Sequence, residues 1–564
     1  MLIYALPNAS PIITKYYGLH HQKHVKLLQM ITSLNLTSLN PIHYPNPLIT
    51  QFDSQQKPIH GGITILNLAK KALSGILWAY LSHFGRHAVT FIVMTILARL
   101  LVPEQFGLIA FATLLTGFIE TVRGFGVNDA LIYTNKDVEK AASTVFVINV
   151  VIGFLQFAIA YAIAPVALRF VDDPIIVDVI RVLSLIFIIT GFGLTFDALL
   201  QKELKFKKLF VPELLATFIK GIVSVALAFM GFGVWSIVFG QLVGGLARTV
   251  VKIYVLGWIP KFYFYMEQAR ELWQYGAQIL MFELLNVSLE QADQLFIGTL
   301  IGSLQLGYYT IAVKIPELII ANFSLILTKS LFPAFSKLQD DIETLTKGFL
   351  LTTRYTSFIT IPAGIGMFSV GPELILFIYG NQWEPAIPLF QVLALLGMVM
   401  TLPWSAGDVF KAIGRPDVST KLLVVEALYT FPLIFAFAFY FRTAVMASTA
   451  NLLALCVTTV LRLVVVSRFL KINPMVFPKI FLTPFISAGV MGLGIYAWRM
   501  FAISINLPMV IILIASILLG IIIYAAMMFI LERDELMNLV ATIKQMRQDN
   551  DDDEEEDTPV NLTV

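Results

Sequence analysis

Basic side chains interrupt several long apolar stretches of this sequence, and they are the residues most able to do chemistry. Arg86 and His87 lie in one stretch, Lys220 in a second and Lys314 in a third. An ionisable group inside a bilayer costs about 2.5–3.5 kcal/mol on insertion scales, so each is a candidate for lining a water-filled path. Arginine can also form paired hydrogen bonds with phosphate oxygens. These residues are therefore candidates for binding an anion within the membrane.

Acidic side chains in a neighbouring stretch indicate a second kind of chemistry. Glu290 and Asp293, together with Gln291 and Gln294, form the most polar patch inside an apolar stretch. Intramembrane carboxylates often mark ion or proton paths, so Glu290 and Asp293 are candidates for holding a coupling cation, H⁺ or Na⁺. His87 is a candidate proton relay, because histidine changes charge near neutral pH.

Each of these residues also has a purely structural interpretation. Lys314 and Glu317 stand three residues apart and could neutralise each other on one helix face. Glu290 and Asp293 could form a polar helix face, and His87 could be a packed histidine with its hydrogen bonds satisfied. The sequence leaves these alternatives open.

Several classes of chemistry lack their usual motifs. The chain has a single cysteine, Cys456, no G-x-x-x-x-G-K-[ST] phosphate loop and no group of His, Cys and Glu at zinc spacing. We therefore expect no cofactor, no bound metal, no catalytic residue and no nucleic-acid partner.

The composition predicts that helices in a bilayer hold these side chains. The 564 residues are 57% hydrophobic and only 13% charged, with a mean hydropathy of +0.80, whereas soluble chains have roughly 25% charged residues. The apolar stretches are long enough to cross about 30 Å of hydrocarbon as helices. They predict an all-α integral membrane protein with about fourteen transmembrane helices. The predicted spans are 73–98, 105–127, 141–168, 175–200, 209–231, 233–257, 272–300, 305–332, 349–378, 386–410, 418–441, 443–466, 479–501 and 507–531.

The distribution of basic residues predicts the orientation of these helices. If the chain before the first helix is cytoplasmic, the inner connections contain 24 Lys and Arg residues and the outer connections only five. Cytoplasmic loops are enriched in Lys and Arg, so both termini are predicted to be cytoplasmic. The short outer turns leave no room for an extramembrane enzyme domain.

A short turn recurs and indicates an internal duplication. ARLLVPEQFGLIA at 98–110 and GTLIGSLQLGYYT at 298–310 place Gln105 and Gln305, and Gly107 and Gly307, 200 residues apart. Six predicted helices separate the turns, so the copies share one orientation, as in parallel repeats about an axis along the membrane normal. We predict two six-helix lobes with a cavity between them, plus two C-terminal helices. The predicted parts are a disordered extension (1–65), the first lobe (66–257), a linker (258–271), the second lobe (272–470), the last two helices (471–531) and an acidic cytoplasmic tail (532–564).

Several stretches resemble one family of transporters. LAKKALSGILWAYLSHFGRHAVTFIVMTILARLLVPEQFGLIAFA (68–112), LEQADQLFIGTLIGSLQLGYYTIAVKI (289–315), LFPAFSKLQDD (331–341) and YGNQWEPAIPLFQVLAL (379–395) resemble the Wzx-type oligosaccharide flippases. These belong to the multidrug/oligosaccharidyl-lipid/polysaccharide exporter superfamily, and the resemblance is to its colanic-acid and teichuronic-acid subgroup. It covers about residues 66–500.

The resemblance implies a secondary transporter of the bacterial cytoplasmic membrane that flips undecaprenyl-pyrophosphate-linked oligosaccharides by alternating access, for polysaccharide or lipopolysaccharide export. Lipid-linked oligosaccharide, membrane lipids, a coupling cation and polysaccharide assembly proteins would be its partners. The related lipid II flippases use cations of their first and eighth helices at the substrate cavity, which implies pyrophosphate binding by Arg86 and Lys314 and, more weakly, Lys220. The alternatives are a multidrug or cation antiporter of the same superfamily and a membrane-embedded polymerase or ligase. A deep arginine argues against the first and the short outer turns against the second.

Overall fold

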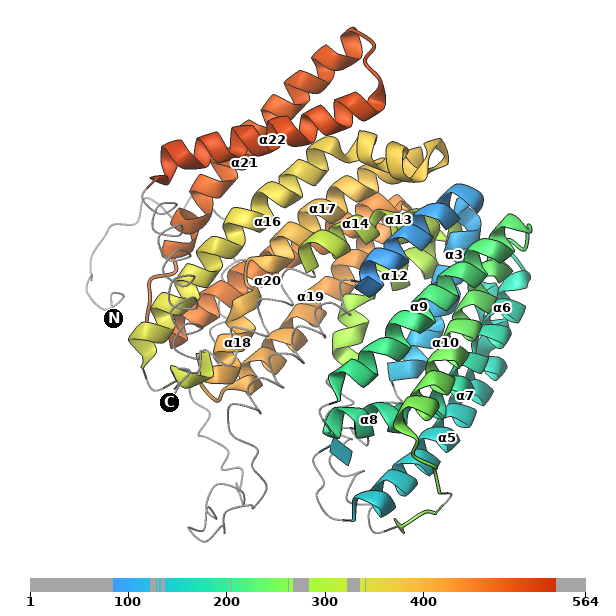
Figure 1. Ribbon diagram of the computed structural model, residues 1–564. Helices are drawn as coiled ribbons and strands as arrows, with labels where there is room; N and C mark the ends of the chain where they lie inside the picture. Colours follow the sequence, from blue (N-terminus) through green and yellow to red (C-terminus); the bar gives the residue numbers. More distant parts are fainter. Residues whose placement is uncertain are drawn as a thin grey trace, which may run out of the picture. The chain divides into compact units, whose positions relative to one another are not determined.

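The computed structural model consists of α-helices joined by short turns, and contains no strand in the residues that it describes (Figure 1). It describes residues 85–121, 128, 131–132, 137–203, 205–261, 263–266, 284–321, 335–339 and 341–533. The predicted N-terminal extension (1–65) and residues 534–564 of the predicted acidic tail lie outside this part of the chain.

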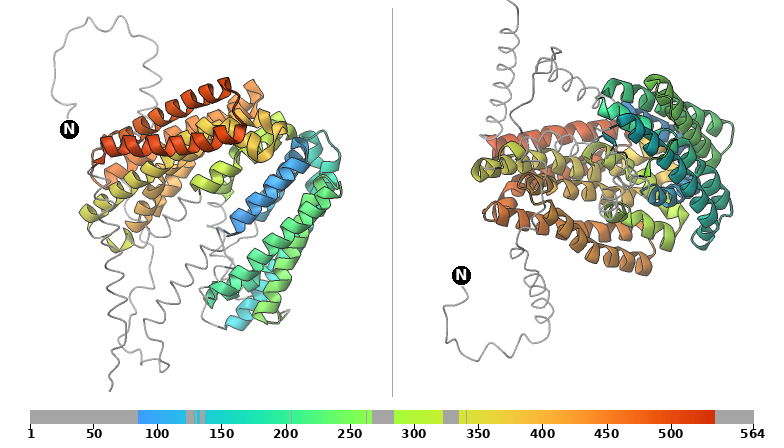
Figure 2. Two further views of the ribbon diagram at one scale, coloured as in Figure 1. Left: turned by 45° about the horizontal axis from the view of Figure 1, so that its top comes forward. Right: turned by 90° about the horizontal axis from the view of Figure 1, so that it is seen from below.

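The first half of the described chain forms one group of packed helices. Residues 85–100 are helical, and the later helices pack on one another, with α9 and α10 side by side in every view (Figures 1 and 2). The elements are α3 (Pro103–Thr121), α5 (Val138–Ile163), η3 (Ala164–Arg169), α6 (Ile175–Leu183), α7 (Leu185–Gly191), α8 (Leu194–Lys202), α9 (Phe206–Phe229) and α10 (Val234–Leu256).

The second half forms a second group. Here α16 packs against α17, α21 and α22, while α19 packs against α20. The elements are α12 (Ala292–Phe296), η4 (Ile297–Ile301), α13 (Ser303–Ala312), α14 (Lys314–Pro316), η5 (Glu317–Ala321), α16 (Ile342–Tyr379), η6 (Asn381–Ala386), α17 (Ile387–Thr401), α18 (Trp404–Ala412), α19 (Pro416–Phe441), α20 (Ala444–Phe469), α21 (Val476–Ser504) and α22 (Met509–Leu531).

The helical membrane architecture predicted from the sequence is confirmed. Within the described residues, ten helices are long and apolar enough to cross a membrane, and each coincides with a predicted span. The four remaining predicted spans, 73–98, 105–127, 272–300 and 305–332, lie partly outside the described residues. Their described parts are largely helical.

The duplicated turn occupies matching positions in the two halves. A Cβ atom added to Gly233, just before α10, would lie 2.7 Å from Nε2 of Gln105. In the second half, the backbone N–H of Ala444, at the start of α20, donates a hydrogen bond of 3.2 Å to Oε1 of Gln305. Since α10 and α20 are the sixth and twelfth predicted helices, each glutamine meets the corresponding helix of its own half. This supports the parallel duplication.

The two copies of the turn also pack against each other. α3 lies along α13. A Cβ atom on Gly107 would overlap the backbone carbonyl of Ser303, and a Cβ atom on Gly307 would overlap that of Pro103. Pro103 and Ser303 are the first residues of α3 and α13. The contact is therefore reciprocal, as expected where equivalent surfaces meet across a twofold axis.

Hydrogen bonds from η6 and from Arg99 surround this crossing. The indole N–H of Trp383, a fully buried residue, donates to the carbonyl of Ala98 at 2.8 Å, and its ring meets Phe106 edge to face. Nε of Arg99 donates to the carbonyl of Ile378 at 2.9 Å. These contacts lie at the helix ends that are predicted to face outward. They join the first half of the chain to the second half on that side.

Candidate functional site

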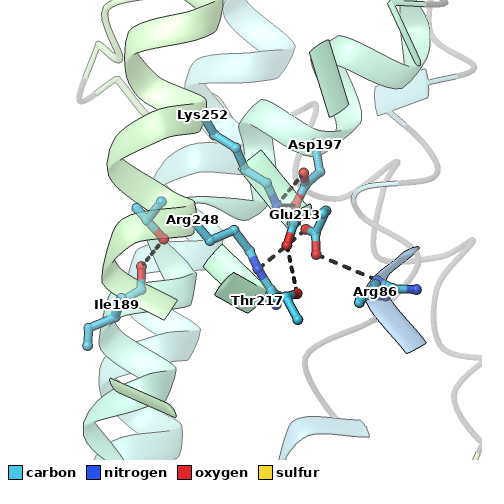
Figure 3. Close-up of polar contacts among 8 residues, drawn as sticks. Arg86, Ile189, Asp197, Glu213, Thr217, Arg248 and Lys252 are labelled. Carbon is cyan, nitrogen blue, oxygen red and sulfur yellow. Dashed lines mark hydrogen bonds and ion pairs between the residues drawn. The ribbon is translucent and has the colours of Figure 1, made fainter. Parts of the chain in front are cut away.

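The carboxylate of Glu213, in α9, is shared by three basic side chains (Figure 3). Its oxygens lie 3.6 Å from Nη1 of Arg86, 3.4 Å from Nε of Arg248 and 3.0 Å from Nζ of Lys252. Arg86 belongs to the helix at 85–100, and the other two cations to α10. We call this set, with Asp197 of α8, the Glu213 cluster. It contains three cations and two carboxylates.

Lys252 fixes the acidic part of the cluster. Its side chain is only 3% exposed, and its ammonium lies 2.7 Å from Oδ1 of Asp197 as well as 3.0 Å from Glu213. Two carboxylates on one buried ammonium are held in place, because a buried charge separated from its partner is strongly destabilised. Lys252 therefore holds α8, α9 and α10 together and positions Glu213.

The two arginines are bound more loosely. Arg86 and Arg248 each have 39% of their side chain exposed, and their distances of 3.6 and 3.4 Å to Glu213 are ion-pair contacts longer than a charge-assisted hydrogen bond. Nε of Arg248 is buried and donates no hydrogen bond within the described structure. Each arginine thus retains hydrogen-bonding capacity for another anion.

Lys220 and Lys314 extend the basic surface toward the second half. Lys220, in α9, lies close enough to Arg248 and to Lys314 to feel the charge of both. A Cβ atom on Gly244 of α10 would lie 2.8 Å from Cβ of Lys220, so the α10 face that carries Gly244 and, one turn on, Arg248 meets Lys220. No ion pair to Lys220 is found among the described side chains.

Lys314 has the local partner that its spacing to Glu317 allows. Its Nζ lies 2.9 Å from Oε2 of Glu317, and 36% of the Lys314 side chain is exposed. The i, i+3 pairing considered from the sequence is therefore present. The exposed part of the Lys314 side chain remains open to a ligand.

The basic residues lie at different depths. Lys314 stands eleven residues after the start of α13 at Ser303, which is about 17 Å along a helix, near the middle of a bilayer. Arg86 stands fourteen residues before Leu100, or about 21 Å from that helix end. Lys220 stands nine residues before Phe229, the outer end of α9, or about 14 Å, and Arg248 stands fourteen residues after Val234, the outer start of α10, or about 21 Å. Arg86 and Arg248 thus lie nearer the predicted inner side, and Lys220 and Lys314 nearer mid-membrane.

Asp293 forms a second polar site, in the second half. The side chain is 2% exposed, and its Oδ2 accepts hydrogen bonds from the hydroxyl of Tyr309 at 2.6 Å and the amide of Asn451 at 3.3 Å. Its Oδ1 accepts from the backbone N–H of Gln294 at 2.9 Å. Three segments therefore meet at one buried carboxyl group, namely α12, α13 and α20.

The other candidates for ion coupling lie in different surroundings. Glu290 is exposed and accepts a hydrogen bond of 3.0 Å from the amide of Asn286, one turn earlier on the same helix. His87 is half-buried beside Arg86 in the chain. Glu290 and Asp293, grouped by the sequence, thus have separate partners.

The sequence interpretation missed three members of the Glu213 cluster. The count of inner Lys and Arg residues includes Arg248 and Lys252 as residues near the inner end of the predicted span 233–257, and no sequence motif marks Glu213, although all three lie within long helices. The available signal was spacing. Arg248 and Lys252 stand four residues apart on one face of a helix, and an acidic residue near the start of the preceding antiparallel helix falls opposite them.

Comparisons with known proteins agree with this membrane-helical architecture. Residues 96–388, more than half of the chain, match the family described as Polysaccharide biosynthesis protein, and the chain belongs to that family. It is 26% identical over 356 residues to the teichuronic acid biosynthesis protein TuaB of Bacillus subtilis, covering 63% of this chain and 74% of TuaB. It is 25% identical over 378 residues to the lipopolysaccharide biosynthesis protein WzxC of Escherichia coli, covering 65% and 75%.

The fold resembles that of a solved lipid flippase. The lipid II flippase MurJ in an inward closed conformation superposes with a TM-score of 0.68 at 16% identity, covering 82% of this chain and all of MurJ. At this identity the likeness concerns the fold. It confirms the arrangement of membrane helices expected from the family resemblance.

Proposed function

We propose that this protein flips undecaprenyl-pyrophosphate-linked oligosaccharide repeat units across the bacterial cytoplasmic membrane for polysaccharide or lipopolysaccharide export. The observation that supports this most directly is the series of basic side chains within membrane helices of a polysaccharide biosynthesis family member. A diphosphate entering a region of low dielectric constant needs fixed positive charge, since its water shell is lost there. The oligosaccharide would follow through a polar cavity between the lobes while the polyprenyl tail remains in lipid.

In this proposal the diphosphate binds to Arg86, Lys220 and Lys314. Arg86 supplies a planar fork suited to two phosphate oxygens, and the lysines act as point charges. The graded depth of these residues would let the diphosphate move from the inner side toward mid-membrane without leaving positive charge. Alternating access then requires the contact between the outer ends of α3 and α13 to open when the predicted lobes, 66–257 and 272–470, separate on the outer side.

Asp293 is the strongest candidate for coupling transport to a cation gradient. A buried carboxyl group that three helical segments share can change their packing when it binds H⁺ or Na⁺. Glu290, exposed at the end of the helical stretch just before α12, and His87, beside Arg86, are the weaker candidates. We further propose that both termini face the cytoplasm, that polysaccharide assembly proteins take up the product, and that the chain itself catalyses no reaction.

Transport by purified protein in vesicles tests the proposal. Wild-type protein should move labelled undecaprenyl-diphosphate oligosaccharide between leaflets without lengthening it, whereas a polymerase would lengthen the glycan. The Arg86→Ala variant should reduce the rate at least about tenfold, because one phosphate contact is worth about 1.4 kcal/mol or more. Arg86→Lys should retain part of it.

Lys347→Ala is the matched control. Lys347 is 69% exposed and pairs with Glu343 one turn away on α16, so its loss removes a cation outside the basic series. Equal transport by wild type and Arg86→Ala at equal expression would refute the role of Arg86. Transport of cationic drugs in place of the lipid-linked glycan would instead indicate a multidrug antiporter.

A further inference from the structure

Charge in the Glu213 cluster is divided unequally. The buried ammonium of Lys252 bonds both carboxylates at hydrogen-bond distance, whereas the half-exposed guanidinium groups of Arg86 and Arg248 meet Glu213 only at 3.6 and 3.4 Å. Asp197 and Glu213 neutralise two of the three cations. With Lys220 beside Arg248, the local excess is two positive charges among the described side chains.

An excess of positive charge in a membrane protein calls for an anion. Like charges repel more strongly as the dielectric constant falls, so Lys220 is unfavourable without an anion where it meets the α10 face that carries Arg248. Arg248 also has a buried Nε with no hydrogen-bond acceptor in the described structure. Its guanidinium therefore has an unsatisfied donor beside the excess charge.

We propose that Glu213 is the resident counter-ion of Arg86 and Arg248, and that the diphosphate of the substrate replaces it on both arginines. Arg248 is then a further substrate-binding residue. While the diphosphate is bound, Lys252 and Asp197 hold the displaced Glu213 carboxylate in place. When the lobes move apart, this carboxylate returns to the two arginines and helps to release the diphosphate. This proposal rests on the proposed function and specifies how the substrate diphosphate leaves Arg86 and Arg248.

The exchange predicts opposite effects from two substitutions. Glu213→Gln removes the competing charge but retains the side-chain shape, so pyrophosphate should bind about tenfold more tightly. In vesicles the same variant should show a lower KM and a lower kcat, because release becomes slower. Arg248→Gln should weaken pyrophosphate binding about tenfold, and Arg248→Lys should restore part of it, since lysine keeps the charge but loses the fork.

Glu426→Gln is the matched control. Glu426 lies on α19 and pairs with Arg462 of α20 at 2.7 Å, so this variant neutralises a carboxylate on the corresponding helix pair of the second half. Its affinity for pyrophosphate should equal that of wild type.

The test is calorimetric titration of the purified full-length protein with inorganic pyrophosphate, followed by transport in vesicles. Unchanged or weaker pyrophosphate binding by Glu213→Gln would overturn the exchange. Unchanged pyrophosphate binding by folded Arg248→Gln would also overturn it, so the test remains decisive if Glu213→Gln fails to fold. Wild type that transports the glycan while Glu213→Gln keeps its affinity refutes the exchange alone. Wild type that binds pyrophosphate in a Glu213-dependent way but transports no glycan refutes the flippase proposal alone.

Discussion

The helix pair α9–α10 in the first half and the helix pair α19–α20 in the second half carry a basic residue at the same position. Lys252 lies 18 residues after Val234, the start of α10, and Arg462 lies 18 residues after Ala444, the start of α20. Each reaches a glutamate on the preceding helix, Glu213 at 3.0 Å and Glu426 at 2.7 Å. The duplication therefore extends from the repeated turn to a repeated ion pair.

The surroundings of the two pairs differ. Lys252 is almost fully buried and also binds Asp197, while Glu213 is shared with two arginines. Arg462 is 33% exposed and has Glu426 at hydrogen-bond distance. The first half thus accumulates positive charge, whereas the second half pairs this arginine locally and buries the Asp293 carboxyl group among hydroxyl and amide donors. In the proposed function, one duplicated frame holds an anion in the first half and a coupling cation in the second.

The frame that the halves share should be the least tolerant of change. Gly107→Ala and Gly307→Ala each place a methyl group against the backbone carbonyl that begins the opposite helix, and backbone gives way less readily than side chain. Overpacking usually costs about 1–3 kcal/mol, and we expect more than about 3 kcal/mol here. Both variants should lose most of their folded protein, measured by size-exclusion chromatography after graded heating.

Gly407→Ala is the control, because nothing lies within 4 Å of a Cβ atom at this position of α18. It should behave as wild type, or be slightly more stable because alanine favours helix. If Gly107→Ala lost most of its folded protein and Gly307→Ala lost none, the contact between α3 and α13 would not be reciprocal and the two halves would not be equivalent.

Most of the fold could be predicted from the sequence because membrane helices are determined by local hydrophobicity. Ten predicted spans coincide with helices of the structure, since a run of apolar residues has few alternatives in lipid. The breaks within individual membrane-spanning helices could not be predicted from hydrophobicity. The predicted span 175–200 consists of α6, α7 and α8, and 386–410 includes a break between α17 and α18, because such breaks depend on packing with other helices.

The candidate site was less predictable than the fold. Depth along a helix identified Arg86, Lys220 and Lys314 from the sequence, but their partners depend on how helices rotate about their axes. Glu213 and Arg248 became candidates only when α9 and α10 were seen to face each other. Glu290 and Asp293 stand only three positions apart in the chain, yet the first side chain is exposed and the second is buried, with a turn at Gln291 between their helical stretches.

A smaller effect should separate the two repeated ion pairs. Lys252→Met leaves Asp197 and Glu213 without their buried partner, and we expect a loss of about 2–3 kcal/mol, below the usual range for a buried pair because Arg86 and Arg248 still offset Glu213. Arg462→Met should cost about 1 kcal/mol, as expected of a partly exposed pair. Chemical unfolding in detergent measures both, and equal losses would contradict the difference in charge accumulation drawn between the halves.

The smallest change in stability is expected at Asp293, where the effect on transport should instead be large. Asp293→Asn keeps an acceptor for the Tyr309 hydroxyl, so stability should change by about 1 kcal/mol or less. The amide binds neither H⁺ nor Na⁺ as a carboxylate does, so an imposed gradient of the coupling cation should no longer accelerate transport. Glu290→Gln is the matched control three positions earlier in the chain, where the carboxylate is exposed, and it should retain the acceleration. Retention by Asp293→Asn and loss by Glu290→Gln would move the coupling site out of the buried group and to the helix surface.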